Sequence, residues 1–131
     1  MPGRCGVREK VRRVEDLEVF RRAYQLSLAI HKASLALPRI EQFALADQLR
    51  RASKSICANL VEGFAKQSHS AAEYRRYLTV AIGSSDEMQL WLRYAVDLGY
   101  IESDEGRQWI ADYVEISKML QGLYASWSSV S

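Results

Sequence analysis

Apolar residues recur every three or four positions along four long segments of the chain, which are separated by short polar breaks. No segment shows the sustained alternation of apolar and polar residues that is typical of a half-buried strand. The third segment stops just before Gly99, a residue type that is common directly after a helix. The pattern predicts an all-α protein with helices at residues 16–37, 43–65, 70–98 and 103–127.

The residues that flank these segments are of types that begin and end helices. Asp16 and Ser103 each precede a periodic stretch, so we expect their side chains to cap the first and fourth helices. Ser70, with Glu73 three residues later, has the pattern of a capping box before the third helix. Pro38 cannot continue a helix, so the first helix ends before it.

Helices of similar length with short connections pack as antiparallel neighbours. The apolar positions of the last two helices alternate in steps of four and three residues, which is coiled-coil spacing. These positions are Tyr74, Leu78, Ala81, Ser85, Met88, Leu92 and Ala95 in the third helix and Trp109, Tyr113, Ile116, Leu120, Leu123 and Trp127 in the fourth. We predict a single domain at residues 14–131, an antiparallel up-down-up-down four-helix bundle with a left-handed twist, preceded by a flexible basic arm at residues 1–13.

The first helix carries two apolar stripes on nearly opposite faces. One stripe contains Val19, Ala23, Leu26, Ile30, Ala33 and Leu37, and the other contains Leu17, Phe20, Tyr24, Leu28, His31 and Leu35. A helix that packs on one core needs only one such stripe. We predict that the stripe of Val19, Ala23, Leu26, Ile30, Ala33 and Leu37 contacts another copy of the chain in a homo-oligomer. The alternative is a first helix that lies centrally in its own bundle.

The net charge of +2 hides an uneven distribution of charged residues. Residues 1–76 contain 15 basic and 8 acidic side chains, whereas residues 77–131 contain 3 basic and 8 acidic ones. A basic half suits contact with a polyanion, and it equally suits contact with the acidic half of a second copy.

Seven basic residues are candidates for nucleic-acid contact: Arg12, Arg13, Arg50, Arg51, Lys54, Arg75 and Arg76. The helical register turns Arg50, Arg51 and Lys54 outward, while Arg75 and Arg76 lie toward the other end of the bundle. No aromatic residues accompany them in a stacking motif, so RNA or DNA would be held through its phosphates without base readout. The alternative is a solvated or ion-paired face.

The chain lacks the short motifs of enzyme and cofactor sites. Its two histidines, His31 and His69, belong to no HExxH or Glu-x-x-His pattern, and no glycine-rich phosphate loop is present. Cys5 and Cys57 have no metal-ligand or CxxC spacing, which favours a reduced, cytoplasmic protein. We therefore predict no catalysis, no metal and no cofactor. No apolar run is long enough to cross a membrane.

Several short motifs together resemble a known family. They are QLRRA at 48–52, SI at 55–56, NLVEGF at 59–64, AIGS at 81–84 and DLGY at 97–100. Over residues 16–127 the chain resembles the bacterial four-helix bundle proteins that are encoded in, or related to, intervening sequences of 23S ribosomal RNA. That family is also similar to the accessory protein of diversity-generating retroelements, which works with a reverse transcriptase and its RNA. The resemblance implies a non-enzymatic homopentameric ring with a nucleic-acid or ribonucleoprotein role.

Two functions remain open from the sequence. The first is a cytoplasmic, non-catalytic oligomer that binds nucleic acid or a ribonucleoprotein partner through the seven basic residues. The second is a protein-interaction adaptor or scaffold without nucleic-acid binding, in which those residues pair with acidic residues of neighbouring subunits.

Overall fold

The computed structural model describes residues 11–128, and within that range it contains helices and no strands. Two short 3-10 helices, Val14–Asp16 and Arg39–Glu41, precede the first and second long helices. The long helices are α2 (Glu18–Ser34), α3 (Leu45–Lys66), α4 (Ala71–Asp97) and α5 (Ser103–Ser128). The predicted all-α class is confirmed, while residues 1–10 of the predicted arm lie outside the described residues.

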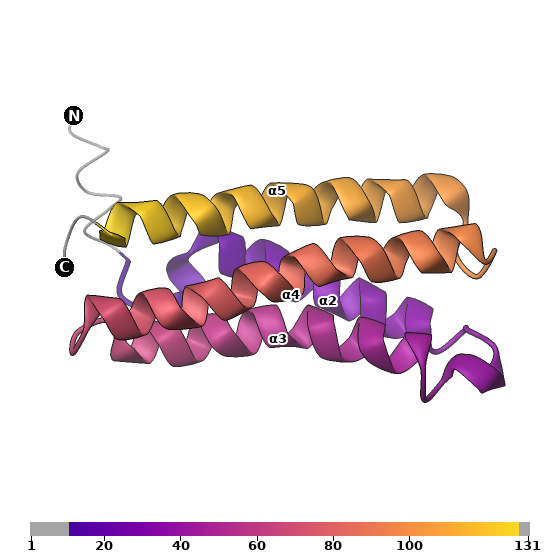
Figure 1. Cartoon of the computed structure of the whole chain (residues 1–131), viewed down its shortest axis with the longest axis horizontal. Coiled ribbons are helices and arrows are strands. Elements are labelled where there is room, and N and C mark those ends of the chain that lie inside the picture. Colours follow the sequence, from indigo (N-terminus) through magenta and orange to yellow (C-terminus); the bar gives the residue numbers. More distant parts are fainter. Residues whose placement is uncertain (1–10, 129–131) are drawn as a thin grey trace.

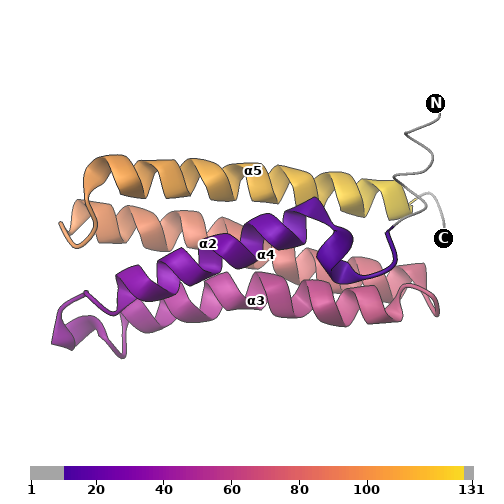
Figure 2. The same ribbon diagram turned by 180° about the vertical axis from the view of Figure 1, so that it is seen from behind.

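The four long helices form a bundle in which consecutive helices run in opposite directions (Figures 1 and 2). Contacts join α2 to α3, α3 to α4, α4 to α5 and, more sparsely, α5 to α2. In Figure 2, α2 crosses the bundle obliquely, so that its first turns lie toward α5 and its last turns lie against α3. The gap between α2 and α5 therefore widens along α2.

The core contains the apolar positions predicted for the last two helices. All seven predicted positions of α4 are buried: Tyr74, Leu78, Ala81, Ser85, Met88, Leu92 and Ala95. Tyr113, Ile116 and Leu120 of α5 are buried too, and Trp109, Leu123 and Trp127 pack against the core at its edge. Because the side chains repeat in steps of four and three, one face of each helix is removed from water along its whole length.

Two glycines let neighbouring helices approach closely. A Cβ at Gly63 of α3 would lie 2.8 Å from the Cβ of Tyr77 in α4, which is too close for two carbon atoms. A Cβ at Gly106 of α5 would collide with the side chain of Val96 in α4. The α3–α4 and α4–α5 pairs therefore depend on hydrogen atoms at these two positions.

The ends of α4 lie where predicted, with the serine half of the predicted capping box present, while the Ser70 N–H donates to the carbonyl of Lys66 and not to Glu73. The Ser70 hydroxyl accepts a hydrogen bond from the Glu73 N–H at 3.1 Å, which caps the first turn. At the other end Gly99 has a φ of 81°, and the N–H of Tyr100 donates to the carbonyl of Ala95 at 2.8 Å. This is a Schellman motif, which requires the left-handed conformation that glycine adopts without strain.

The starts of α2 and α5 differ from the prediction. Asp16 lies in the first 3-10 helix, where its carboxylate accepts hydrogen bonds from the N–H groups of Arg12 (2.9 Å) and Arg13 (3.1 Å). These bonds lower the pKa of Asp16, and α2 begins only at Glu18. The α5 cap is Glu102, whose carboxylate accepts from the Glu105 N–H at 3.0 Å. A carboxylate one residue earlier thus takes the place expected for a serine hydroxyl.

Candidate interaction surfaces

The apolar stripe that was predicted to meet another copy lies inside the bundle. Its members Val19, Ala23, Ile30 and Leu37 are buried in the core of their own chain, and Leu26 and Ala33 are half-buried. The predicted interface at these six residues is therefore wrong for the four that are buried. Small residues decide the outcome, because Ala23 and the buried Ser27 and Ser34 lie on this side of the helix and let α2 pack closely on its own bundle.

The other stripe of α2 faces solvent only in part, since Leu17, Phe20 and His31 are half-buried. The side chains of Tyr24, Leu28 and Leu35 are 47%, 41% and 61% exposed. At the start of the stripe, the rings of Phe20 and Tyr24 stack with their centroids 6.1 Å apart. Large apolar side chains repeated along one helix face at this exposure are characteristic of a surface that another molecule covers.

The turn between α2 and α3 carries the two most exposed large apolar residues described. Ile40 is 83% exposed and Phe43 is 98% exposed. Sequence analysis did not identify them, because Ile40 lies in the break between two predicted helices and Phe43 was predicted to be the first residue of the second one, whereas α3 begins at Leu45. The signal that could have found them is two bulky apolar residues in a short connection that has no core face of its own.

Hydrogen bonds connect this turn to the rest of the bundle. The Gln42 amide donates to the carbonyl oxygens of Ser34 (2.9 Å) and Leu37 (3.0 Å). The Tyr100 hydroxyl donates to a carboxylate oxygen of Glu41 at 3.0 Å, which raises the pKa of that tyrosine. Polar side chains thus point inward to fixed partners while Ile40 and Phe43 point away from the core.

Arg50 is part of the same arrangement, which corrects the prediction that it faces solvent. Its guanidinium donates to the Ser34 hydroxyl (2.8 Å), the Gln42 carbonyl (2.8 Å) and the Gln42 side-chain oxygen (3.2 Å). Arg75, also predicted to contact nucleic acid, is half-buried and donates to the carbonyl of Trp127 at 2.9 Å. Both arginines satisfy backbone or buried groups of their own chain, because a long side chain can reach back across a helix–helix boundary.

The other five predicted cations are exposed: Arg12, Arg13, Arg51, Lys54 and Arg76. Arg51 lies 3.9 Å from Asp47, and Arg76 lies 3.4 Å from Glu73. The Lys54 ammonium lies 2.9 Å from Nδ1 of His31. Arg51 and Lys54 belong to the first half of α3 and Arg76 to the start of α4, at opposite ends of the bundle (Figure 1). The cations therefore do not form one compact patch.

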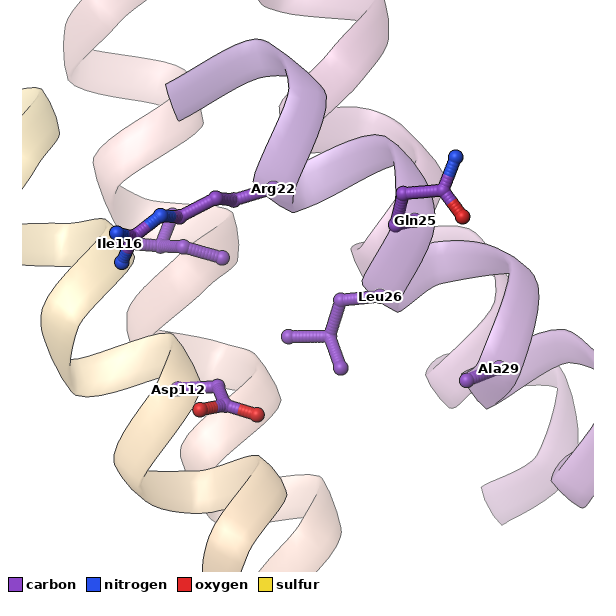
Figure 3. Close-up of a pocket in the computed structure, with 6 residues that line it drawn as sticks. All are labelled: Arg22, Gln25, Leu26, Ala29, Asp112 and Ile116. Atoms are coloured by element: carbon purple, nitrogen blue, oxygen red, sulfur yellow. The ribbon is translucent and has the colours of Figure 1, made fainter. Parts of the chain in front are cut away.

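A groove of about 430 Å³ lies where α2 and α5 diverge. Figure 3 shows Leu26 of α2 pointing into it, with Ile116 of α5 across from it. The rims are charged, since Arg22 extends from α2 and the carboxylate of Asp112 faces the gap from α5. Arg22 is already paired with Glu18 at 2.8 Å, whereas Asp112 accepts a hydrogen bond from the amide of Gln108. The groove thus combines an apolar floor with a carboxylate that forms no ion pair among residues 11–128.

The bundle interior contains polar residues but no reactive arrangement among the residues described. The Ser117 hydroxyl donates to Asp86 (2.8 Å), and the Ser85 hydroxyl donates to the carbonyl of Tyr113 (3.0 Å). Burial raises the pKa of the Cys57 thiol to about 11, so it stays protonated at neutral pH and is a poor nucleophile. Within residues 11–128, no three histidine, cysteine, aspartate or glutamate side chains converge as metal ligands, and no helix there is long and apolar enough to cross a membrane.

Comparison with known proteins supports the fold and identifies the family. A solved structure from Bacteroides thetaiotaomicron, a protein of unknown function from the S23 ribosomal protein family, is similar with a TM-score of 0.72. The two share 24% sequence identity, and the match covers 82% of this chain and 95% of that one. No curated protein matches the chain. A family model, described as 23S rRNA-intervening sequence protein, matches residues 15–122. The chain therefore belongs to the family of 23S rRNA-intervening sequence proteins.

Proposed function

We propose that this protein is a non-catalytic scaffold that works as a self-associated assembly of helical bundles. The observation that carries the proposal is the group of exposed apolar side chains in this part of the chain, which are Tyr24 and Leu28 of α2, Leu35 directly after it, and Ile40 and Phe43 of the following turn. Fully burying an exposed side chain of this size contributes about 1.5 to 3 kcal/mol, and covering one that is already about half-buried contributes about half of that. Several such side chains together can supply the affinity of a stable contact. A homopentameric ring, implied by the family resemblance, is the arrangement we favour.

The experiment is a measurement of molar mass by light scattering across a wide range of protein concentrations. Leu28→Glu places a charge in the centre of the stripe, and we expect it to raise the dissociation constant at least tenfold. Val61→Glu is the matched control, because Val61 lies on α3, outside the stripe, and is 47% exposed against 41% for Leu28. If Leu28→Glu and Val61→Glu assemble with the same dissociation constant, the exposed apolar residues of α2 do not form the contact between copies.

Nucleic-acid binding is the second candidate function. It is favoured by the five exposed cations Arg12, Arg13, Arg51, Lys54 and Arg76, and by a family description that refers to 23S ribosomal RNA. In an oligomer these cations repeat in every subunit, so a modest number in one chain becomes a large number over the assembly. The expected binding is to phosphates, without base specificity and with strong salt dependence.

The test for this second function is a titration of a structured ribosomal RNA fragment at several salt concentrations. Arg51→Glu combined with Lys54→Glu is expected to weaken binding at low salt for all RNA sequences alike. Arg107→Glu is the control, because Arg107 is an exposed cation in the acidic part of the chain. If the RNA does not bind, or if its affinity does not change with salt concentration, nucleic-acid binding is refuted and only the scaffold function remains.

A further inference from the structure

His31 lies in the centre of the exposed apolar residues of α2. It follows Leu28 by three residues and precedes Leu35 by four, so the three side chains are neighbours on one helix face. Leu28 is 41% exposed and Leu35 is 61% exposed, while the ring of His31 between them is half-buried. A molecule that covers Leu28 and Leu35 therefore also covers His31.

The ring of His31 contacts a cation of the neighbouring helix. Nζ of Lys54 in α3 lies 2.9 Å from Nδ1 of His31. An ammonium group only donates hydrogen bonds, so Nδ1 accepts this one and the ring is neutral in this arrangement. Uptake of a proton at Nδ1 replaces the hydrogen bond with two cations in contact.

The charged groups around this pair do not balance a further positive charge. Within about two turns of the pair, α2 and α3 carry four cations and one carboxylate: Lys32, Arg50, Arg51, Lys54 and Asp47. Asp47 already lies 3.9 Å from Arg51. Protonation of His31 therefore adds a charge to a part of the surface that is already positive.

The carboxylates of the other segments near α2 lie elsewhere or have other partners. Glu41, in the turn after α2, accepts a hydrogen bond from a tyrosine hydroxyl, and Arg39 of the same turn is a further cation. Asp112 of α5 faces the groove (Figure 3), which lies on the side of α2 turned away from the ring. Glu15 and Asp16 belong to the 3-10 helix at the far end of α2.

We infer that the contact between copies is sensitive to pH through His31: it forms while the ring is neutral and weakens when the ring takes up a proton. This inference rests on the proposed self-association through the exposed apolar residues of α2. Histidine is the side chain whose charge changes between pH 5 and 8. In a covered contact a protonated ring loses its water and keeps the repulsion from Lys54, whereas in a free chain water still reaches it.

The direction of the effect follows from proton linkage. Free chains bind more protons than assembled chains, because only the free chain accommodates the charged ring. A fall in pH therefore favours dissociation, and a rise in pH favours assembly.

The experiment measures the dissociation constant by light scattering at pH 8 and at pH 5.5, at one ionic strength. For the unaltered protein we expect a value about fivefold higher, or more, at pH 5.5. His31→Gln keeps an acceptor for Lys54 but cannot take up a proton, so its dissociation constant should change less than about twofold. His69→Gln is the matched control, because His69 is the other histidine of the chain and is exposed in the turn before α4.

Lys54→Gln gives a second readout, because it removes the cation beside the ring while His31 can still be protonated. We expect the ratio of the two dissociation constants to fall in this variant, and an unchanged ratio would overturn the role of the Lys54 contact. A dissociation constant that does not depend on pH, or a pH dependence that survives in His31→Gln, would overturn the inference and leave the scaffold proposal standing. A protein that stays monomeric at both pH values and at every concentration would overturn both.

Discussion

Replacing Arg50 with alanine should destabilise the fold far more than the same change at the next residue. Arg50 and Arg51 are adjacent arginines on α3, and the sequence predicted that both face solvent. In the structure, Arg50 joins α3 to the end of α2 and to the turn between them through three hydrogen bonds to Ser34 and Gln42. Arg51 makes a single ion pair with Asp47, and its side chain is 76% exposed.

The size of the effect follows from the partners that Arg50 leaves behind. A hydrogen bond to a charged group contributes about 1.5 to 3 kcal/mol, and bonds that share one guanidinium are not additive. Ser34 is fully buried, so its hydroxyl loses a donor that water cannot replace. We expect Arg50→Ala to lower the free energy of unfolding by about 2 to 4 kcal/mol, and the melting temperature by about 6 to 15 °C. Arg51→Ala should cost less than about 0.5 kcal/mol.

The assay is urea unfolding followed by helical circular dichroism, with both variants at one protein concentration because assembly and stability are linked. A lower midpoint with an unchanged slope would show a loss of stability rather than a change in the unfolded state. If Arg50→Ala and Arg51→Ala unfold at the same urea concentration, the three hydrogen bonds of Arg50 do not contribute to the stability of the bundle.

Three further predictions concern the stability of the bundle. Gly106→Ala should lower the melting temperature, because the new Cβ collides with Val96. At Gly122 a new Cβ meets no atom within 4 Å, so Gly122→Ala should be neutral or stabilising by up to about 1 kcal/mol. Thermal unfolding of the two variants tests this difference. Burial raises the pKa of Tyr74 to about 12 and that of Tyr113 further still. Both rings are therefore neutral when folded and ionise more easily when unfolded, so stability should be complete below about pH 10 and fall as pH rises above it. Tyr113→Phe should reduce this alkaline loss and add about 1 kcal/mol, since its buried hydroxyl has no partner among the described residues; unfolding at pH 8 and pH 11 tests both statements.

Much of the fold could be predicted from sequence because the period of the apolar residues is a local property. In α4 every predicted core position is buried, and Ser70 and Gly99 mark its ends as expected. Helix starts were less predictable where two neighbouring residues could both cap. Glu102 and Ser103 each carry an oxygen that can accept a backbone hydrogen bond, and the longer carboxylate reached the first turn of α5.

The orientation of α2 could not be predicted, because its two stripes are nearly equal in apolar content. The choice depends on packing against α3, which favours the stripe with Ala23 and the small serines and leaves Tyr24 and Leu28 outside. The presence of a surplus apolar stripe was therefore readable from the sequence, but the face that carries it was not.

The interaction surfaces were only partly predictable for a related reason. A helical register states where a Cα lies, but the side chain of Arg50 is long enough to reach partners on another segment. Ile40 belongs to no predicted helix and Phe43 was only the first residue of one, so periodicity assigned neither of them a role. The groove at Leu26 exists because α2 crosses the bundle obliquely, and crossing angles depend on the packing of all four helices.

The molar mass of the protein in solution tests the scaffold proposal most directly. One chain weighs 14.9 kDa, and light scattering at increasing concentration should give a multiple of that mass, with a fivefold value for the ring implied by the family. Leu28→Glu should shift the mass toward 14.9 kDa, whereas Val61→Glu should not. A mass of 14.9 kDa for the unaltered protein at every concentration would contradict the proposal that this chain works as a self-associated scaffold.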